Sequence, residues 1–134
     1  MPQFPVTPAR EKTLARIPDY AVELNPANSH VTVTCQGTVI AESSSALVVK
    51  ETRHADVYYL PREDVNMSMF TATDLDTYCP FKGHASYWSL TLATGAEEKT
   101  EDNIVWSYVS PYVEVEGLKD YMSFYTNRTE ITSS

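Results

Sequence analysis

TYCPFKGHASYWSL, residues 77–90, combines a Cys79-Pro80 pair, Lys82 beside a glycine, and the adjacent aromatics Tyr87 and Trp88. Residues 85–92 favour a β-strand, because aromatic side chains fit a pleated, half-buried surface. Reactive, rigid and aromatic residues seldom gather in so short a stretch without a reason. The segment therefore predicts a mainly β domain with a binding or catalytic site beside this strand.

Alternating apolar residues predict further strands on both sides of this segment. Val31, Val33 and Cys35 alternate with threonines, and Gln36-Gly37 reads as a turn, so residues 31–35 and 38–42 are expected to form a hairpin. More strands are predicted at residues 46–52, 56–60, 67–71, 103–109 and 123–132. Short helical turns are predicted at 62–66 and 117–122, and an acidic turn at 95–102. This spacing predicts an all-β, antiparallel sandwich or barrel.

The length of 134 residues suits a single compact domain. Prolines at positions 2, 5, 8, 18 and 26 disfavour a regular helix or a central strand near the start. We therefore expect an N-terminal arm over residues 1–28, parts of which could still pack, and a single mainly β domain over residues 29–134.

Charge and cysteine content narrow the partners and the compartment. Eighteen acidic and ten basic residues give a formal charge of −8, which disfavours nucleic acid and anionic membrane surfaces. No apolar run approaches the roughly 18 residues that span a bilayer. The two cysteines are fewer than secreted domains of this size usually carry, and the first residues lack an apolar signal segment. We therefore expect a cytoplasmic protein with reduced thiols.

Glu51 is the first candidate for chemistry. In a strand over residues 46–52, Leu47, Val49 and Glu51 share one face. Glu51 is then either a carboxylate at the solvent-exposed end of the strand or a carboxylate in a pocket. A pocket carboxylate would bind a ligand or serve as a general acid or base.

Lys82 and Cys79 are the second and third candidates. Lys82 either extends along the surface or binds and reacts in apolar surroundings, where it could pair with Glu51. Cys79 is either a small buried hydrophobic residue or a nucleophilic thiol activated by Lys82. Acid–base work by Glu51 and Lys82 ranks ahead of thiol catalysis, because no base at a recognisable spacing accompanies the cysteine.

The aromatic residues are expected either to build the core or to wall a pocket. Tyr87, Trp88, Trp106 and Tyr108 lie on the two strongest predicted strands. Tyr58 and Asp64 flank Pro61 and are expected near the same pocket, although residues 61–64 equally fit a solvated turn.

We expect no metal and no cofactor. The histidines and cysteines show no paired ligand spacing. The four glycines do not cluster into a phosphate-binding loop, and no G-x-S-x-G motif occurs.

The combined motifs resemble domain-of-unknown-function family 427, found in bacteria and fungi and sometimes given a nucleotidyltransferase-like label. The matching residues are Gly37, 41–43, 51–52, 57–64, 79–83, 85–89, 106–108 and Pro111. The resemblance extends over about residues 31–125 and implies a compact, mainly β domain similar to the β-tent architecture. It implies no settled reaction. The Gly-Ser pair with spaced aspartates that would hold nucleotide-bound metal ions is absent, as are the cysteine pairs of zinc-binding β-tent relatives.

The leading hypothesis is a domain that binds a small organic ligand or metabolite in an aromatic-walled pocket. Glu51, Lys82 and Tyr108 would anchor the ligand, and acid–base isomerisation, cyclisation or hydrolysis could follow. The alternatives are a non-catalytic module for a ligand or peptide and a purely structural role for the motif. A second copy of the chain is an additional candidate partner.

Overall fold

The computed structural model describes residues 21–52, 54–94 and 97–134. Within these residues the chain forms ten strands: β1 (Val22–Pro26), β2 (Val31–Cys35), β3 (Thr38–Ser43), β4 (Leu47–Glu51), β5 (Val57–Pro61), β6 (Phe70–Cys79), β7 (Gly83–Thr94), β8 (Glu97–Ser107), β9 (Tyr121–Phe124) and β10 (Glu130–Ser133). Three short 3-10 helices connect them: η1 (Arg62–Asp64), η2 (Met67–Met69) and η3 (Val113–Leu118).

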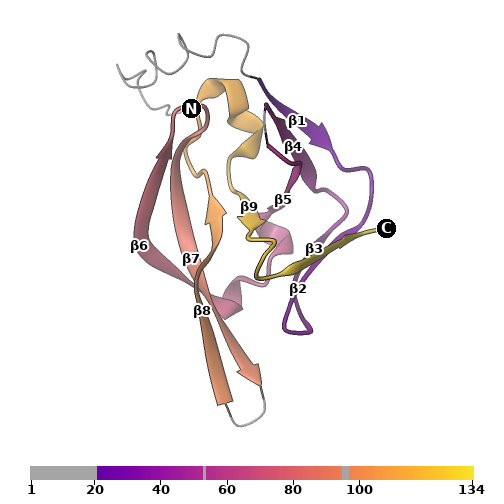
Figure 1. Cartoon of the computed structure of the whole chain (residues 1–134), viewed down its shortest axis with the longest axis vertical. Coiled ribbons are helices and arrows are strands. Elements are labelled where there is room, and N and C mark those ends of the chain that lie inside the picture. The colour runs from indigo at the N-terminus through magenta and orange to yellow at the C-terminus, as the bar shows by residue number, and fades with distance from the viewer. Residues whose placement is uncertain (1–20, 53, 95–96) are drawn as a thin grey trace.

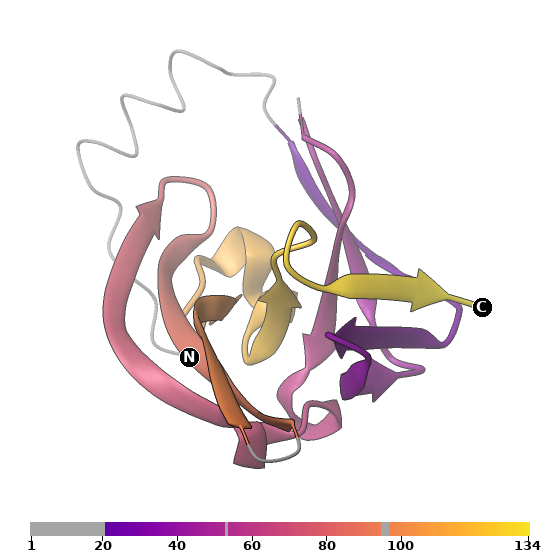
Figure 2. The ribbon, with the colours of Figure 1, turned by 60° about the horizontal axis from the view of Figure 1, so that its bottom comes forward.

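The described strands form two antiparallel sheets (Figure 1). The larger sheet has the order β1-β4-β5-β9-β8-β7-β6, and the smaller has the order β10-β2-β3. The larger sheet curls into a half-barrel, so that β1 and β4 face β6 and β7 across its concave side (Figure 2). The prediction of a compact, mainly β, antiparallel domain is confirmed.

The hairpin of β2 and β3 forms as its sequence predicts. Gln36 and Gly37 both have positive φ angles, 50° and 82°, between the paired residues Cys35 and Thr38. Two positive φ angles define the hairpin turn whose twist matches that of its flanking strands, and a glycine adopts one of them without strain.

Two strands are longer than their apolar residues predict. Residues 67–69 form η2 instead of a strand, and β6 then continues to Cys79. The predicted acidic turn at 95–102 is wrong from residue 97 onward, because β8 begins at Glu97; residues 95–96 lie outside the described part. Backbone pairing between β6, β7 and β8 explains both differences, since these strand segments are polar and mostly exposed and carry no apolar alternation.

The ends of the described chain also differ from the prediction. Val22–Pro26, assigned to the arm, form strand β1 paired with β4, and Pro26 is tolerated because β1 is an edge strand; residues 1–20 lie outside the described part. The single strand predicted at 123–132 is wrong, because β9 joins the larger sheet and β10 the smaller one. The last helical turn precedes its predicted position and is η3.

Buried residues form two clusters. The first lies between the two sheets and includes Val31, Leu90, Ile104 and Phe124. The second lies on the concave side of the larger sheet and consists of Val49, Tyr59, Ala85, Tyr87, Tyr108, Val115 and Leu118. The last two come from η3, which therefore fills part of the half-barrel. None of the described helical segments has the length and apolar character needed to span a bilayer.

Because η3 is anchored by Leu118, shortening this side chain should destabilise the fold. Leu118 is fully buried, and Leu118→Ala should lower the free energy of unfolding by about 3 kcal/mol through lost burial and a cavity. Val113 belongs to the same helix but is 63% exposed. Val113→Ala should therefore change the free energy of unfolding by less than about 0.5 kcal/mol. Urea unfolding measures both. Equal effects would mean that η3 does not pack into the half-barrel.

Candidate functional site

A cleft of about 430 Å³ opens on the concave side of the larger sheet, above the second core cluster. Its described lining consists of Glu51, His54, Val57, Tyr59, Tyr78, Cys79, Pro80, Phe81, Lys82, Tyr87, Trp106, Tyr108 and Tyr125. These residues come from strands β4 to β8 and from the segments that follow β4, β6, β8 and β9. Strands that are distant in sequence therefore contribute to one aromatic hollow.

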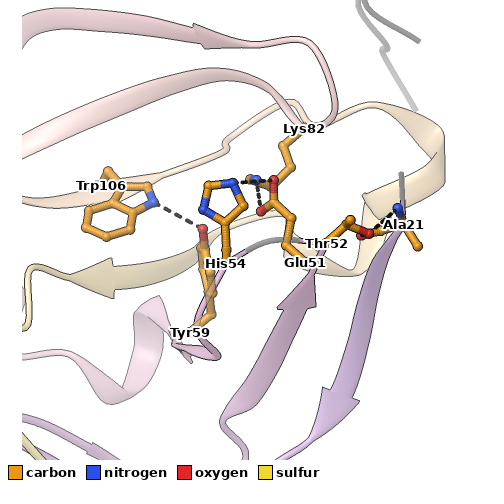
Figure 3. Close-up of polar contacts among 7 residues, drawn as sticks. All are labelled: Ala21, Glu51, Thr52, His54, Tyr59, Lys82 and Trp106. Carbon is orange, nitrogen blue, oxygen red and sulfur yellow. Dashed lines mark hydrogen bonds and ion pairs between the residues drawn. The ribbon is translucent and has the colours of Figure 1, made fainter. Parts of the chain in front are cut away.

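An ion pair forms one wall of this cleft. Nζ of Lys82 lies 2.5 Å from Oε1 of Glu51, and the two side chains are only 8% and 13% exposed. Nε2 of His54 lies 4.0 Å from the other oxygen, Oε2, and its side chain is 60% exposed. Figure 3 shows the Glu51 carboxylate directed toward both Lys82 and His54. The carboxylate thus connects a buried ammonium group with an imidazole at the surface.

A tight turn between β6 and β7 carries Lys82 into the cleft. The Lys82 amide donates to the Cys79 carbonyl at 3.2 Å, and proline at the second position of such a turn fixes the φ angle that the turn requires. Gly83 follows with φ of 115°, which favours glycine, and pairs with Cys79 to start β7. The Lys82 carbonyl accepts a hydrogen bond from the Tyr112 amide, which fixes the turn against the segment before η3.

The face of β4 directs Glu51 inward. Leu47 and Val49 point toward the second cluster, and Glu51 continues the same alternation to the end of the strand. The next residue, Thr52, accepts a hydrogen bond from the Ala21 amide at 2.9 Å, which holds this strand end against the residue before β1 (Figure 3). Of the two interpretations left by the sequence, the structure places Glu51 in a cleft and not at an exposed strand end.

Register between strands builds the aromatic wall. Tyr87 on β7 pairs directly with Trp106 on β8, and directly paired residues share a face of the sheet. The Trp106 ring lies edge-on to Tyr59, with centroids 6.3 Å apart, and 4.7 Å from the ring of Tyr125. Its Nε1 donates to the Tyr59 hydroxyl at 3.1 Å (Figure 3). The wall is therefore a connected set of rings from different strands.

Two buried tyrosines keep their protons in this environment. Burial raises the pKa of Tyr59, and the Trp106 hydrogen bond opposes that rise without cancelling it. Burial also raises the pKa of Tyr108, with a smaller contribution from the potential negative charge on Tyr59. Lys82 Nζ lies 5.8 Å from the centroid of the Tyr108 ring. Both phenols are thus neutral hydrogen-bond donors across the physiological pH range.

The structure brings most of the predicted site residues together. The predicted residues in the cleft are Glu51, Cys79, Lys82, Tyr87, Trp106 and Tyr108. Cys79 ends β6 as a free, half-buried thiol. Its catalytic role, like those of Glu51 and Lys82, stays a prediction.

Three predicted residues lie elsewhere. Tyr58 packs against the first core cluster, because its neighbour Tyr59 occupies the cleft side of β5. Trp88 likewise points to the face of β7 opposite that of Tyr87 and packs in the first core cluster. The Arg62 guanidinium lies over its ring, 4.9 Å from the centroid. Asp64 accepts a hydrogen bond from the Ser43 hydroxyl at 2.5 Å and ties η1 to β3. These three therefore lie outside the cleft, contrary to the expected grouping, and their ligand-binding role stays a prediction.

The sequence prediction missed Tyr59, His54 and Tyr125. Strand alternation could have indicated Tyr59. Tyr59 pairs with Leu47 on β4, and paired residues share a face of the sheet. Leu47 and Glu51 lie on one face of β4, so Tyr59 lies on the face of Glu51 as well. His54 follows Glu51 by three residues, but no pattern in the sequence predicts that its side chain lies near the Glu51 carboxylate. Tyr125 reaches the cleft only because β9 pairs with β8.

A second groove, of about 620 Å³, lies around η1 and the residues before β9. It is the larger of the two, but its described lining is mostly charged or aliphatic, and Arg62 and Asp120 lie at its surface with their charges 3.9 Å apart. We place the candidate site in the smaller cleft, because among the described residues it combines a mostly buried ion pair with aromatic walls.

No group of three or more potential metal-ligating side chains occurs among residues 21–52, 54–94 and 97–134. The family described as domain of unknown function (DUF427) matches residues 23–134, which include every described lining residue of the cleft. The chain belongs to this family. The resemblance noted from the sequence motifs is thereby confirmed, and membership in DUF427 brings no activity with it. A comparison with curated proteins found no match.

The buried ion pair of this DUF427 domain should couple strongly in a double-mutant cycle. Lys82→Met leaves the mostly buried Glu51 carboxylate without its ammonium partner and should lower the free energy of unfolding by about 3 kcal/mol. Adding Glu51→Gln should restore part of this loss, with a coupling energy of about 2 kcal/mol. Urea unfolding of the four proteins in the cycle measures the coupling.

The chain offers a matched control in Lys50 and Asp56. Their charged atoms lie 2.9 Å apart, but both side chains are about half exposed, at 53% and 52%. The cycle of Lys50→Met and Asp56→Asn should give a coupling energy below about 1 kcal/mol. A coupling at Lys82 and Glu51 no larger than this control would contradict the buried arrangement.

The raised pKa of Tyr108 predicts a loss of stability at alkaline pH. Below the pKa of an ordinary tyrosine, about 10, this group does not affect the pH dependence of stability. Above that pH the unfolded chain ionises while the folded phenol keeps its proton, so stability falls as pH rises. Tyr108→Phe should reduce this decline by about 1.4 kcal/mol per pH unit. Urea unfolding between pH 8 and 11 tests this, and identical slopes would show that Tyr108 is not protected.

Proposed function

We propose that this domain binds a small, flat organic molecule in the cleft beneath Trp106. The observation that carries the proposal is the pairing of Lys82 with Glu51 at the wall of an aromatic hollow. A fold that needed only stability would gain as much from apolar residues at these two positions, because removing two charges from water offsets much of their attraction. Retaining them in a cleft fits a site that orients a polar group of a ligand.

The dimensions and lining support a small ligand. A volume of about 430 Å³ lies within the usual range for sites that bind small molecules. Ring faces and edges from Tyr59, Tyr87, Trp106 and Tyr125 favour a flat, partly apolar molecule. We propose a cytoplasmic location as well, supported by the thiols of Cys35 and Cys79, both free in the fold.

Acid–base catalysis is a second candidate function, favoured by the position of His54. The Glu51 carboxylate could accept a proton from a bound molecule, and the Lys82 ammonium would stabilise charge that develops nearby. The exposed imidazole, 4.0 Å from Glu51 Oε2, offers a route for that proton to solvent.

Ligand binding is testable through the two tryptophans, because only Trp106 lines the cleft. A library of small aromatic and carbonyl metabolites is titrated into Trp88→Phe, which retains Trp106 as its single indole, and into Trp106→Phe, which retains Trp88. Ligands of the cleft should change the emission of the first variant and leave that of the second nearly unchanged. If no compound does so at millimolar concentration, the binding proposal is wrong.

Catalysis is tested on the compounds that bind. Proton NMR in D2O follows each compound for conversion or deuterium uptake. Glu51→Gln and Lys82→Met should reduce the rate at least about 100-fold, the usual contribution of a general acid or base. Lys50→Met, on the solvent-exposed side of β4, should retain the full rate. Full activity in both cleft variants, or no conversion by the wild type, would contradict acid–base catalysis and leave the binding module.

A further inference from the structure

The hydroxyl groups of the cleft are not equivalent, since some are already hydrogen-bonded within the protein. The Tyr87 hydroxyl lies 2.9 Å from Oγ1 of Thr77, and the Tyr78 hydroxyl lies 2.7 Å from that of Tyr112. These bonds engage Tyr87 and Tyr78 as parts of the wall. Each of these two hydroxyl groups would have to share or give up an existing protein hydrogen bond to hold a ligand.

Tyr59 and Tyr108 differ from these residues. The Tyr59 hydroxyl accepts the Trp106 N–H, and no described residue accepts its own proton. The Tyr108 hydroxyl has no hydrogen-bond partner in the described part of the chain, although the residue is only 7% exposed. Both residues line the cleft and belong to the same buried cluster. Neither hydroxyl proton has an acceptor among the described residues, so both hydroxyl groups can donate to a bound molecule.

The charges of the described lining favour an uncharged ligand as the acceptor for the Tyr59 and Tyr108 hydroxyl groups. The opposite charges of Lys82 and Glu51 form an ion pair in this lining and offset each other. A charged ligand would therefore meet little net opposite charge from this pair. A neutral oxygen with two lone pairs can instead accept from both phenols and leave the ion pair intact.

We infer that the cleft holds a small neutral carbonyl compound, with its oxygen accepting hydrogen bonds from the hydroxyl groups of Tyr59 and Tyr108. This inference rests on the proposed function and names the ligand class and the residues that select it. Phenols that stay protonated in an apolar site are suited to this role, because they can donate without first losing a charge. The flat rings around them receive the rest of the molecule.

Two probes of nearly equal shape test the inference: acetophenone, and isopropenylbenzene, in which a CH2 group replaces the carbonyl oxygen. Binding to the full chain is followed by chemical-shift titration in 1H–15N spectra. Acetophenone should bind about tenfold more tightly than isopropenylbenzene, as two modest hydrogen bonds imply. Tyr108→Phe removes one of the two hydrogen bonds, so it should weaken acetophenone about threefold and leave isopropenylbenzene unchanged.

Tyr58→Phe is the matched control, because Tyr58 adjoins Tyr59 in sequence but packs on the opposite face of β5. It should preserve the wild-type preference for the ketone. Equal affinity of the wild type for both probes, or an unchanged preference in Tyr108→Phe, would overturn the carbonyl assignment while leaving the cleft a binding site. Failure of both probes to shift resonances at the cleft would also overturn it, and the tryptophan titrations decide separately whether other molecules bind.

Discussion

The Glu51–Lys82 ion pair joins two parts of the larger sheet that its strand order keeps far apart. Glu51 ends β4, next to one edge strand, and Lys82 lies in the turn between β6 and β7 at the other edge. Contact between them requires the sheet to curl, as Figure 2 shows. The cleft, its aromatic walls and the position of η3 inside the half-barrel all depend on this curl.

Placing charges and hydroxyls on the concave side has an energetic cost that apolar packing must offset. Buried residues such as Val49, Val115 and Leu118 surround the polar groups and hold the strands in register. Individual buried side chains of this size contribute about 1.5–3 kcal/mol each. The same burial raises the pKa values of Tyr59 and Tyr108 and leaves most of the ion pair's side-chain surface covered. The same packing thus supplies both the stability and the polar chemistry of the cleft.

Alternation along the strands divides the aromatic residues between two roles. Tyr59, Tyr87 and Trp106 face the cleft, whereas their neighbours Tyr58 and Trp88 face the core between the sheets. The sequence shows each pair as adjacent aromatics and does not say which member faces which side. Once one residue is known to face the cleft, strand pairing assigns its partner to the same face. This holds for Tyr87 with Trp106 and for Leu47 with Tyr59. For the same reason, the two members of each adjacent aromatic pair, Tyr58–Tyr59 and Tyr87–Trp88, point to opposite faces of their strand.

The sequence by itself determined the mainly β class, the hairpin at Gln36-Gly37 and the importance of the CPFKG turn, because alternation and turn chemistry act over a few residues. It also pointed to Glu51 and Lys82 as partners. Only the tertiary structure decided that Tyr59 and not Tyr58 lines the cleft, that Asp64 bonds Ser43 at the end of β3, and that residues 123–132 divide between two sheets. Those outcomes depend on pairing between strands far apart in the chain, and local patterns in a sequence do not encode which distant strands meet.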